Sequence, residues 1–191
     1  KSKSGVMITG SHNPKEYNGI KLVINDKPVS GNEILKLIYV DKPISDNSGN
    51  VSYIDVKNDY ILEVKDNINF DYNNKIKIVI DCGNGAAGCI APILFKELGC
   101  EVIELYSEVD GSFPNHHPDP GKLENLKALI DSVKATNADL GLAFDGDGDR
   151  IGLITDKGGV VFPDKILMML SEDILLTRKG TIIFDVKCSN S

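Results

Sequence analysis

The chain has 191 residues, a formal net charge of −7 and 41% hydrophobic residues, which is typical of one or two folded domains with their own core. The scattered basic residues and the net charge would repel a polyanion, which argues against nucleic acid as a partner. No apolar run approaches the roughly 20 residues of a membrane-spanning helix, and no apolar signal core follows Lys1–Lys3, so we expect a cytoplasmic protein without membrane contact.

Apolar runs alternate with amphipathic stretches along the chain, which predicts an α/β fold with mixed, mainly parallel sheets and helices on both faces. A polar stretch at 41–52 contains Pro43 and Gly49 and predicts a linker. We predict strands at 6–9, 20–24, 76–81, 101–105, 140–144, 151–155 and 181–186, and helices at 32–40 behind the cap candidate Ser30, at 58–67, from the glycine-rich turn to about 98, at 123–135 and at 163–176.

The ends of the chain and its cysteines also lead to expectations. There is no initiator methionine, an apolar run begins at Val6, and the last predicted strand is followed by only a few residues, so we expect a fragment of a longer protein. The four cysteines show neither CxxC spacing nor a histidine at zinc-finger distance, so we expect reduced thiols. These cysteines are Cys82, Cys89, Cys100 and Cys188.

The strongest local signal is the acidic loop from Asp145 to Arg150, between two apolar strands. Alternate residues of an extended loop point the same way, so Asp145, Asp147 and Asp149 are expected to converge. Two unit charges about 5 Å apart repel by roughly 3 kcal/mol at an effective dielectric constant of about 20, so the loop needs a cation. Oxygen ligands favour Mg²⁺, Ca²⁺ or Mn²⁺ over zinc.

The acidic loop has three alternative interpretations. A solvated acidic turn with splayed carboxylates and a haloacid-dehalogenase-type phosphatase with an Asp nucleophile both remain open. An EF-hand is excluded, because Arg150 stands where that loop needs glycine, Asp156 stands where it needs glutamate, and the flanks are predicted strands.

The second signal is the turn from Thr9 to Pro14, which follows a short strand and precedes Tyr17–Lys21. A serine at the end of a strand exposes its hydroxyl, so Ser11 is a candidate nucleophile. The neighbouring His12 is weak support for hydrolase chemistry, because adjacent side chains rarely face each other. The alternative is a turn serine that caps the backbone.

Two further patterns each allow a functional and a structural interpretation. Gly83–Gly88, with Glu104 further on, fits a dinucleotide-binding fingerprint, but this spacing also arises where a strand packs closely on the next helix. His116 and His117 could bind a metal, although neighbouring histidines between prolines more often serve loop structure.

Taken together, these motifs resemble the α-D-phosphohexomutase family, and within it the phosphomannomutase/phosphoglucomutase branch. The resemblance covers nearly the whole chain, and the motifs occur in the same order as in the family. It argues against the alternative that Gly83–Gly88 binds a nicotinamide cofactor. The matching stretches are Gly5–Pro14, Tyr17–Lys21, Val79–Gly85, Phe113–Pro120 and Ala143–Arg150.

The resemblance implies a phosphoprotein in which Ser11 carries the transferable phosphoryl group. A phosphate oxygen on Ser11 would complete a Mg²⁺ site with Asp145, Asp147 and Asp149, which come from a different domain. Since phosphoserine carries close to two negative charges, the ion would both anchor it and offset charge during transfer.

The same resemblance assigns roles to the residues around this site. Arg150 would hold phosphate oxygens with its guanidinium fork. His12 and Asn13 would shape the serine loop. Lys21 is similar to the family residue proposed to assist proton transfer at the sugar hydroxyl, with an ordinary surface lysine as the alternative.

The implied activity is that of an isomerase, an intramolecular phosphotransferase. It interconverts hexose 1-phosphate and hexose 6-phosphate through a bisphosphorylated sugar, with a glucose 1,6-bisphosphate-type activator.

The resemblance also implies a division into domains. Residues 1–56 would be the end of the first domain, with the serine loop. Residues 57–159 would be the second domain, with the metal loop, and residues 160–191 the start of the third. The remaining partner would be the rest of the same polypeptide, domains 3 and 4. Without these, we expect weak Mg²⁺ binding and no turnover. A non-catalytic sugar-phosphate- or metal-binding remnant stays open as the contrasting function.

Overall fold

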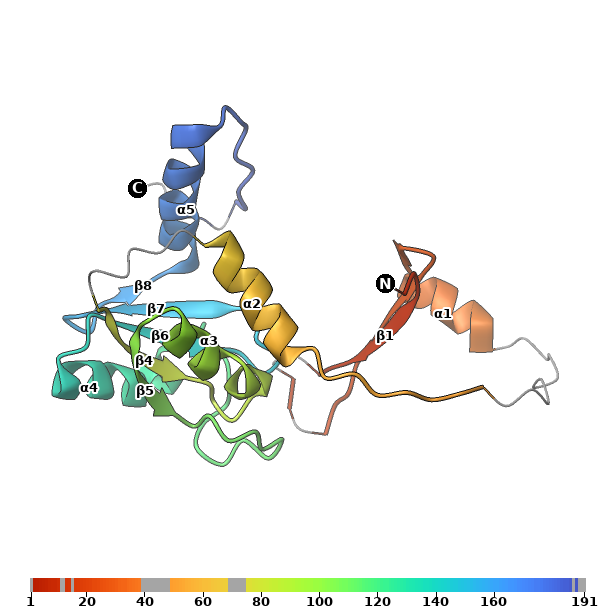
Figure 1. Cartoon of the computed structure of the whole chain (residues 1–191), viewed down its shortest axis with the longest axis horizontal. Helices are drawn as coiled ribbons and strands as arrows, with labels where there is room; N and C mark the ends of the chain where they lie inside the picture. The colour runs from red at the N-terminus through yellow and green to blue at the C-terminus, as the bar shows by residue number, and fades with distance from the viewer. Residues whose placement is uncertain are drawn as a thin grey trace.

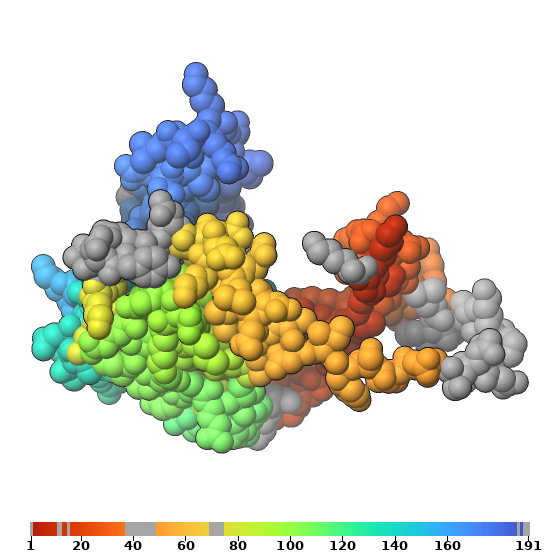
Figure 2. All heavy atoms as spheres, viewed as in Figure 1, coloured from red at the N-terminus to blue at the C-terminus, as the bar shows by residue number. Residues whose placement is uncertain are grey.

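The computed structural model describes residues 2–10, 13–14, 16–38, 49–68, 75–186 and 188. These ranges form a small antiparallel sheet near the N-terminus and a larger five-stranded sheet flanked by helices. The small sheet stands to one side of the larger one (Figure 1), and in the space-filling view it projects from the main body (Figure 2). The predicted α/β fold class is confirmed.

The small sheet contains β1 (Gly5–Ile8), β2 (Ile20–Ile24) and β3 (Lys27–Pro28), in that order. β1 and β2 are antiparallel, and Ile8 lies opposite Ile20. Both ends of the segment 9–19 therefore meet at one end of this sheet, which fixes the base of the serine loop. Ser11 and His12 themselves lie outside the described residues.

Helix α1 (Gly31–Ile38) begins directly after the predicted cap Ser30. The carboxylate of Glu33 accepts hydrogen bonds from the Ser30 backbone N–H at 2.8 Å and from its hydroxyl at 2.7 Å. The backbone bond is the reciprocal half of a capping box, and it lowers the pKa of Glu33 below its ordinary value. Residues 39 and 40, the predicted end of this helix, lie outside the described residues, as does most of the predicted linker.

The larger sheet has the order β5-β4-β6-β7-β8. Its parallel pairs are β4–β5 and β4–β6, whereas β6–β7 and β7–β8 are antiparallel. The bounds are β4 (Lys77–Asp81), β5 (Glu101–Leu105), β6 (Leu140–Phe144), β7 (Ile151–Thr155) and β8 (Val160–Val161).

The expectation of mainly parallel sheets therefore needs a correction, because the described sheets are mixed with fewer parallel than antiparallel pairs. The reason is the length of the connections. Parallel strands need a crossover of a dozen or more residues, and the acidic loop between β6 and β7 is far too short for one. That loop is consequently the turn of a β-hairpin.

Helices cover both faces of the larger sheet, as predicted. On one face, Val79 of β4 packs with Leu129 and Val133 of α4 (Lys127–Thr136), which continues from the 3₁₀ turn η2 (Leu123–Leu126). On the other face, Ile80 packs with Ala91 of α3 (Ala91–Glu97). The alternation along β4 places its neighbouring side chains on opposite faces, so this strand is buried from both sides. Helix α2 (Lys57–Asn67) packs on α3.

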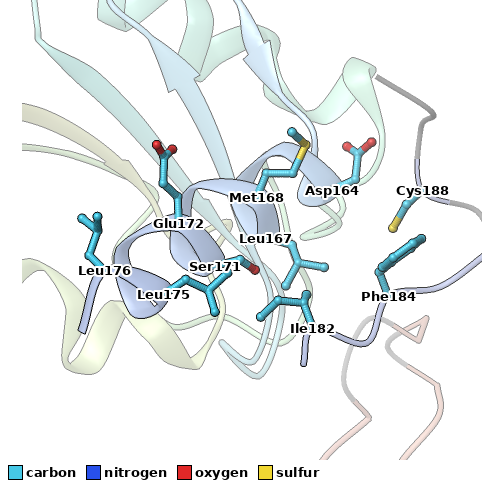
Figure 3. A pocket seen from close by; sticks show the side chains of 10 residues that line it. All are labelled: Asp164, Leu167, Met168, Ser171, Glu172, Leu175, Leu176, Ile182, Phe184 and Cys188. Atoms are coloured by element: carbon cyan, nitrogen blue, oxygen red, sulfur yellow. The ribbon is translucent and has the colours of Figure 1, made fainter. Parts of the chain in front are cut away.

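The last helix, α5 (Pro163–Thr177), lies where it was predicted, but the segment after it differs from expectation. Residues 181–186 form no strand in the described part of the chain, and the side chains of Ile183 and Val186 are 89% and 96% exposed. A strand needs a hydrogen-bonded neighbour, and none lies beside this segment among the described residues. Instead, Ile182 and Phe184 face α5 across an open apolar hollow of about 700 Å³ (Figure 3).

None of the helices in the described ranges is long and apolar enough to cross a membrane.

Candidate functional site

The acidic loop is held in shape by its own backbone. Asp145 follows directly on β6, and its carboxylate accepts a hydrogen bond from the backbone N–H of Arg150 at 3.0 Å. The N–H of Gly148 donates to the carbonyl of Asp145 at 3.1 Å, and Gly148 has a φ of +74°, a conformation that favours glycine. These contacts close the hairpin tightly and turn the acidic side chains toward one another.

The structure brings the three predicted carboxylates together. One oxygen from each of Asp145, Asp147 and Asp149 lies within 4.8 Å of the other two. Asp145 is fully buried, and burial is the main cause that raises its carboxyl pKa above the ordinary value, with the charges of Asp149 and Asp147 adding to the effect. Such a cluster is destabilising without a counter-charge.

The cluster fits a hard divalent cation. The Oδ2 atom of Asp145 is buried and has no hydrogen-bond partner among the described residues, and its nearest cation is the Nε of Arg150 at 3.7 Å. Arg150 Nε also lies 3.9 Å from the Oδ1 atom of Asp149, so one guanidinium is shared between two carboxylates. The all-oxygen donor set matches the preference of Mg²⁺.

Thr9, which directly follows β1, and Lys21 of β2 both contact this cluster. The hydroxyl of Thr9 donates to the Oδ2 atom of Asp147 at 2.9 Å, and Lys21 Nζ lies 3.9 Å from the same oxygen. Two residues near the start of the chain therefore contact the same carboxylate of the acidic loop. Ser11 and His12 are outside the described residues, so their predicted roles stay predictions.

Neighbours of the serine fix the backbone on either side of it. The N–H of Thr9 donates to the carbonyl of Gly19 at 3.0 Å, and the N–H of Asn13 donates to the carbonyl of Gly10 at 2.9 Å. A Cβ on Gly10 would lie 2.6 Å from the carbonyl oxygen of Tyr17, so only glycine fits there without a shift. These contacts fix the base of the serine loop, and Thr9 at its start contacts Asp147.

The sequence patterns did not predict the polar cluster formed by Asp81 and His116. His116 Nε2 lies 3.0 Å from Asp81 Oδ2, and His116 Nδ1 lies 3.0 Å from the carbonyl oxygen of His117. Both ring nitrogens thus face acceptors, and the hydrogen bond to Asp81 is the main cause that raises the pKa of His116. His116 is an anchor of its loop, as the structural interpretation of the two histidines expects.

Asn84 anchors the same region from the glycine-rich turn. It has a left-handed φ of +60°, its Nδ2 donates to the carbonyl of Glu108 at 2.8 Å, and its Oδ1 accepts from Asn115 Nδ2 at 2.7 Å. One sequence signal could have indicated this cluster, although it was not used: Asp81 is an acidic residue at the end of a buried strand, and a buried charge requires a partner.

Comparison with known proteins places these features in one family context. Residues 58–158 match the profile described as phosphoglucomutase/phosphomannomutase, alpha/beta/alpha domain II, and residues 1–40 match that of alpha/beta/alpha domain I. A phosphomannomutase/phosphoglucomutase from Pseudomonas syringae pv. tomato is 54% identical over 190 residues, which cover 98% of this chain and 40% of that protein. A phosphoglucomutase from Neisseria meningitidis serogroup A is 46% identical over 189 residues, covering 96% of this chain and 41% of that protein.

Solved structures agree with the sequence comparisons. The crystal structure of a phosphoglucomutase/phosphomannomutase family protein from Burkholderia thailandensis superposes with a TM-score of 0.81 at 43% identity. The match covers 91% of this chain and 38% of that one. The chain thus spans about two fifths of the length of the relatives it matches.

Proposed function

Because the chain belongs to the phosphoglucomutase/phosphomannomutase family, we propose that it supplies the phosphoserine and the metal-binding loop of an enzyme that interconverts hexose 1-phosphates and hexose 6-phosphates. The observation that carries the proposal is the hydrogen bond from Thr9 to Asp147. It ties the strand that precedes Ser11 to the acidic loop, 138 positions away in the sequence. A serine loop whose first residue contacts one of three clustered carboxylates suits phosphoryl transfer.

In the proposed site, Asp145, Asp147 and Asp149 hold a Mg²⁺ ion together with a phosphate oxygen on Ser11. The bound ion supplies charge stabilisation of the phosphoryl group during transfer. Arg150 is half-exposed beside the cluster, where its guanidinium can hold phosphate oxygens.

The proposed reaction has two transfers that use the same serine. In the first, the bond between phosphorus and the Ser11 oxygen breaks while a sugar hydroxyl forms a new bond to that phosphorus, which yields a bisphosphorylated sugar and a free serine. In the second, the Ser11 oxygen forms a bond to the other phosphorus of the turned sugar while the bond from that phosphorus to the sugar oxygen breaks, and the serine proton goes to that oxygen. Lys21, beside Asp147, assists transfer of the proton that the attacking hydroxyl loses.

The proposal extends to substrate, activator and context. The substrate is a phosphorylated hexose, and a glucose 1,6-bisphosphate-type activator charges Ser11 with its phosphoryl group. Turnover in this proposal requires domains 3 and 4 of the same polypeptide, and the 191-residue chain alone binds Mg²⁺ weakly without meaningful turnover. The proposal is consistent with a matched relative that is more than twice as long as this chain. A cytoplasmic location is part of the same proposal.

Intact-mass analysis of protein purified from cells tests this proposal. We expect a phosphoryl adduct on Ser11 that is absent from Ser11→Ala and present in a Ser2→Ala control. A phosphatase with an Asp nucleophile would give the reverse pattern, with phosphoenzyme retained in Ser11→Ala and lost in Asp145→Asn. Unmodified protein without metal affinity would contradict the proposal and favour a non-catalytic remnant.

A further inference from the structure

The glycine-rich turn after β4 lies directly against the acidic loop. The N–H of Ala86, the first residue of the 3₁₀ helix η1 (Ala86–Cys89), donates to the carbonyl of Gly146 at 2.9 Å. A Cβ on Gly85 would lie 2.8 Å from the Gly146 oxygen and 3.1 Å from the carbonyl oxygen of Asp145. The contact therefore falls on the backbone that joins Asp145 to Asp147.

The backbone conformation of Gly85 does not itself require glycine. Its φ of −85° and ψ of 179° describe extended backbone that any residue adopts. Gly83 in the same turn differs, because its φ of +51° lies in the left-handed region. The missing side chain at Gly85 is thus explained by the close approach of the acidic loop alone.

The turn Gly83–Ala86 cannot move away from the acidic loop, because hydrogen bonds to other residues hold it in place. The N–H of Gly85 donates to the carbonyl of Cys82 at 2.7 Å, and the N–H of Asn84 donates to the carbonyl of Tyr106 at 2.8 Å. The N–H of Gly83 donates to the buried carboxylate of Asp81, which His116 pairs from the other side. A larger residue at position 85 would consequently displace the acidic loop.

We propose that the turn Gly83–Ala86 sets the spacing of the metal-binding carboxylates, with Gly85 and Ala86 as positioning residues for Asp145 and Asp147. This inference rests on the proposed metal site. The 2.8 Å contact is shorter than real Cβ contacts and forces a shift, and the 3.1 Å contact to the Asp145 carbonyl oxygen must open by a few tenths of an ångström. Metal–ligand distances tolerate only about 0.2 Å. A displacement of that size is therefore enough to weaken cation binding.

Titration of the 191-residue chain with Mn²⁺, followed by electron paramagnetic resonance, measures this directly. We expect Gly85→Ala to weaken Mn²⁺ binding by about 10-fold or more, the usual range for residues that support metal ligands. The matched control is Gly111→Ala, an exposed loop glycine whose added Cβ would meet nothing within 4 Å, and it should bind as the unaltered chain does.

A second variant disturbs the same contact from the neighbouring residue, by removing a hydrogen bond and adding a ring. Ala86→Pro removes the N–H donor to Gly146 at the first position of a helical turn, where proline is tolerated, and the extended Gly85 suits a residue before proline. We expect weaker Mn²⁺ binding here too, because the proline ring takes the place of the N–H and pushes the Gly146 carbonyl away. Thermal unfolding of the metal-free variant shows whether it is folded. If Gly85→Ala does not fold, this variant decides.

The outcomes separate this inference from the proposed function. Binding by the unaltered chain that is lost in Asp147→Asn but unchanged in Gly85→Ala and Ala86→Pro would overturn the inference and leave the metal site standing. No Mn²⁺ binding by the unaltered chain, or equal binding by Asp147→Asn, would overturn both.

Discussion

At the scale of single residues, Asp147 joins two distant parts of the chain. It accepts a hydrogen bond from the Thr9 hydroxyl and lies beside the Lys21 ammonium, whereas Asp145 is buried and pairs with Arg150 of its own loop. Two neighbouring carboxylates of one loop thus have different surroundings. Asp147 faces the serine loop, and Asp145 anchors the hairpin.

Replacing Thr9 tests the link between these parts. Thr9→Val keeps the shape of the side chain but removes the donor to Asp147, and hydrogen bonds to charged groups contribute roughly 1.5 kcal/mol or more. We expect the free energy of unfolding in urea to fall by about that amount, with Thr9→Ser retaining most of it. A double-mutant cycle with Asp147→Asn should show coupling, and additive effects would contradict a direct contact.

The pair of His116 and Asp81 makes stability depend on pH. Because the folded protein raises the pKa of His116 above its ordinary value of 6.5, the folded state binds more protons than the unfolded state as pH rises past that value. This stabilisation is complete below pH 6.5 and is lost as pH rises through the raised pKa.

Urea unfolding across this range checks the pH dependence. His116→Gln should unfold more easily than the unaltered chain below pH 6.5, and the difference should shrink at higher pH. The neighbouring variant His117→Gln serves as the control and should keep the decline with pH. A pH-independent difference for His116→Gln would show that the pair does not act through charge.

At the scale of elements, the β6–β7 hairpin concentrates negative charge that its folding must tolerate. Asp149 is 57% exposed and shares Arg150 with Asp145. Repulsion at such an exposed position costs less than at a buried one, because water screens it. The charge of Asp149 therefore opposes folding mildly when no cation is bound.

Neutralising that charge has opposite effects with and without metal. Asp149→Asn should stabilise the metal-free chain by up to about 1 kcal/mol, since exposed charge pairs rarely exceed this. Added Mg²⁺ should then raise its melting temperature less than that of the unaltered chain. Calorimetric melting with and without Mg²⁺ measures both effects, and equal Mg²⁺-induced shifts would speak against Asp149 as a ligand.

Much of the fold could be predicted because the buried strands have clear apolar patterns. β4, β6 and β7 coincide closely with predicted runs. The two-residue strands β3 and β8 were missed, since they exist through pairing with a neighbour and are too short to show a period. The segment 181–186 has a strand pattern, but patterns do not supply the neighbouring strand that a sheet requires.

The candidate site was predictable where its residues are close in sequence. The spacing of Asp145, Asp147 and Asp149 predicted that their carboxylates converge, because the backbone of one short loop is enough to bring them together. The contact of Thr9 with Asp147 and the pairing of Asp81 with His116 could not be deduced from spacing, because each joins residues far apart in the chain. Such contacts follow from the arrangement of whole elements.

At the scale of the whole molecule, two sheets of different construction meet at the acidic loop. The small antiparallel sheet presents the base of the serine loop, and the larger sheet presents the hairpin between β6 and β7. The larger sheet is the better packed of the two, with buried clusters on both of its faces, whereas Val6, Ile8 and Ile20 of the small sheet are more than half exposed. The site thus depends on how the small sheet docks.

Phosphorus NMR of the chain carrying phosphoserine at position 11 tests most directly whether the serine loop and the acidic loop share one ion. Paramagnetic Mn²⁺ broadens a phosphorus resonance only when it binds nearby. We predict that the phosphoserine signal of the unaltered chain disappears on addition of Mn²⁺ and persists in Asp147→Asn. A sharp phosphoserine signal while Mn²⁺ is bound to the acidic loop would contradict the account.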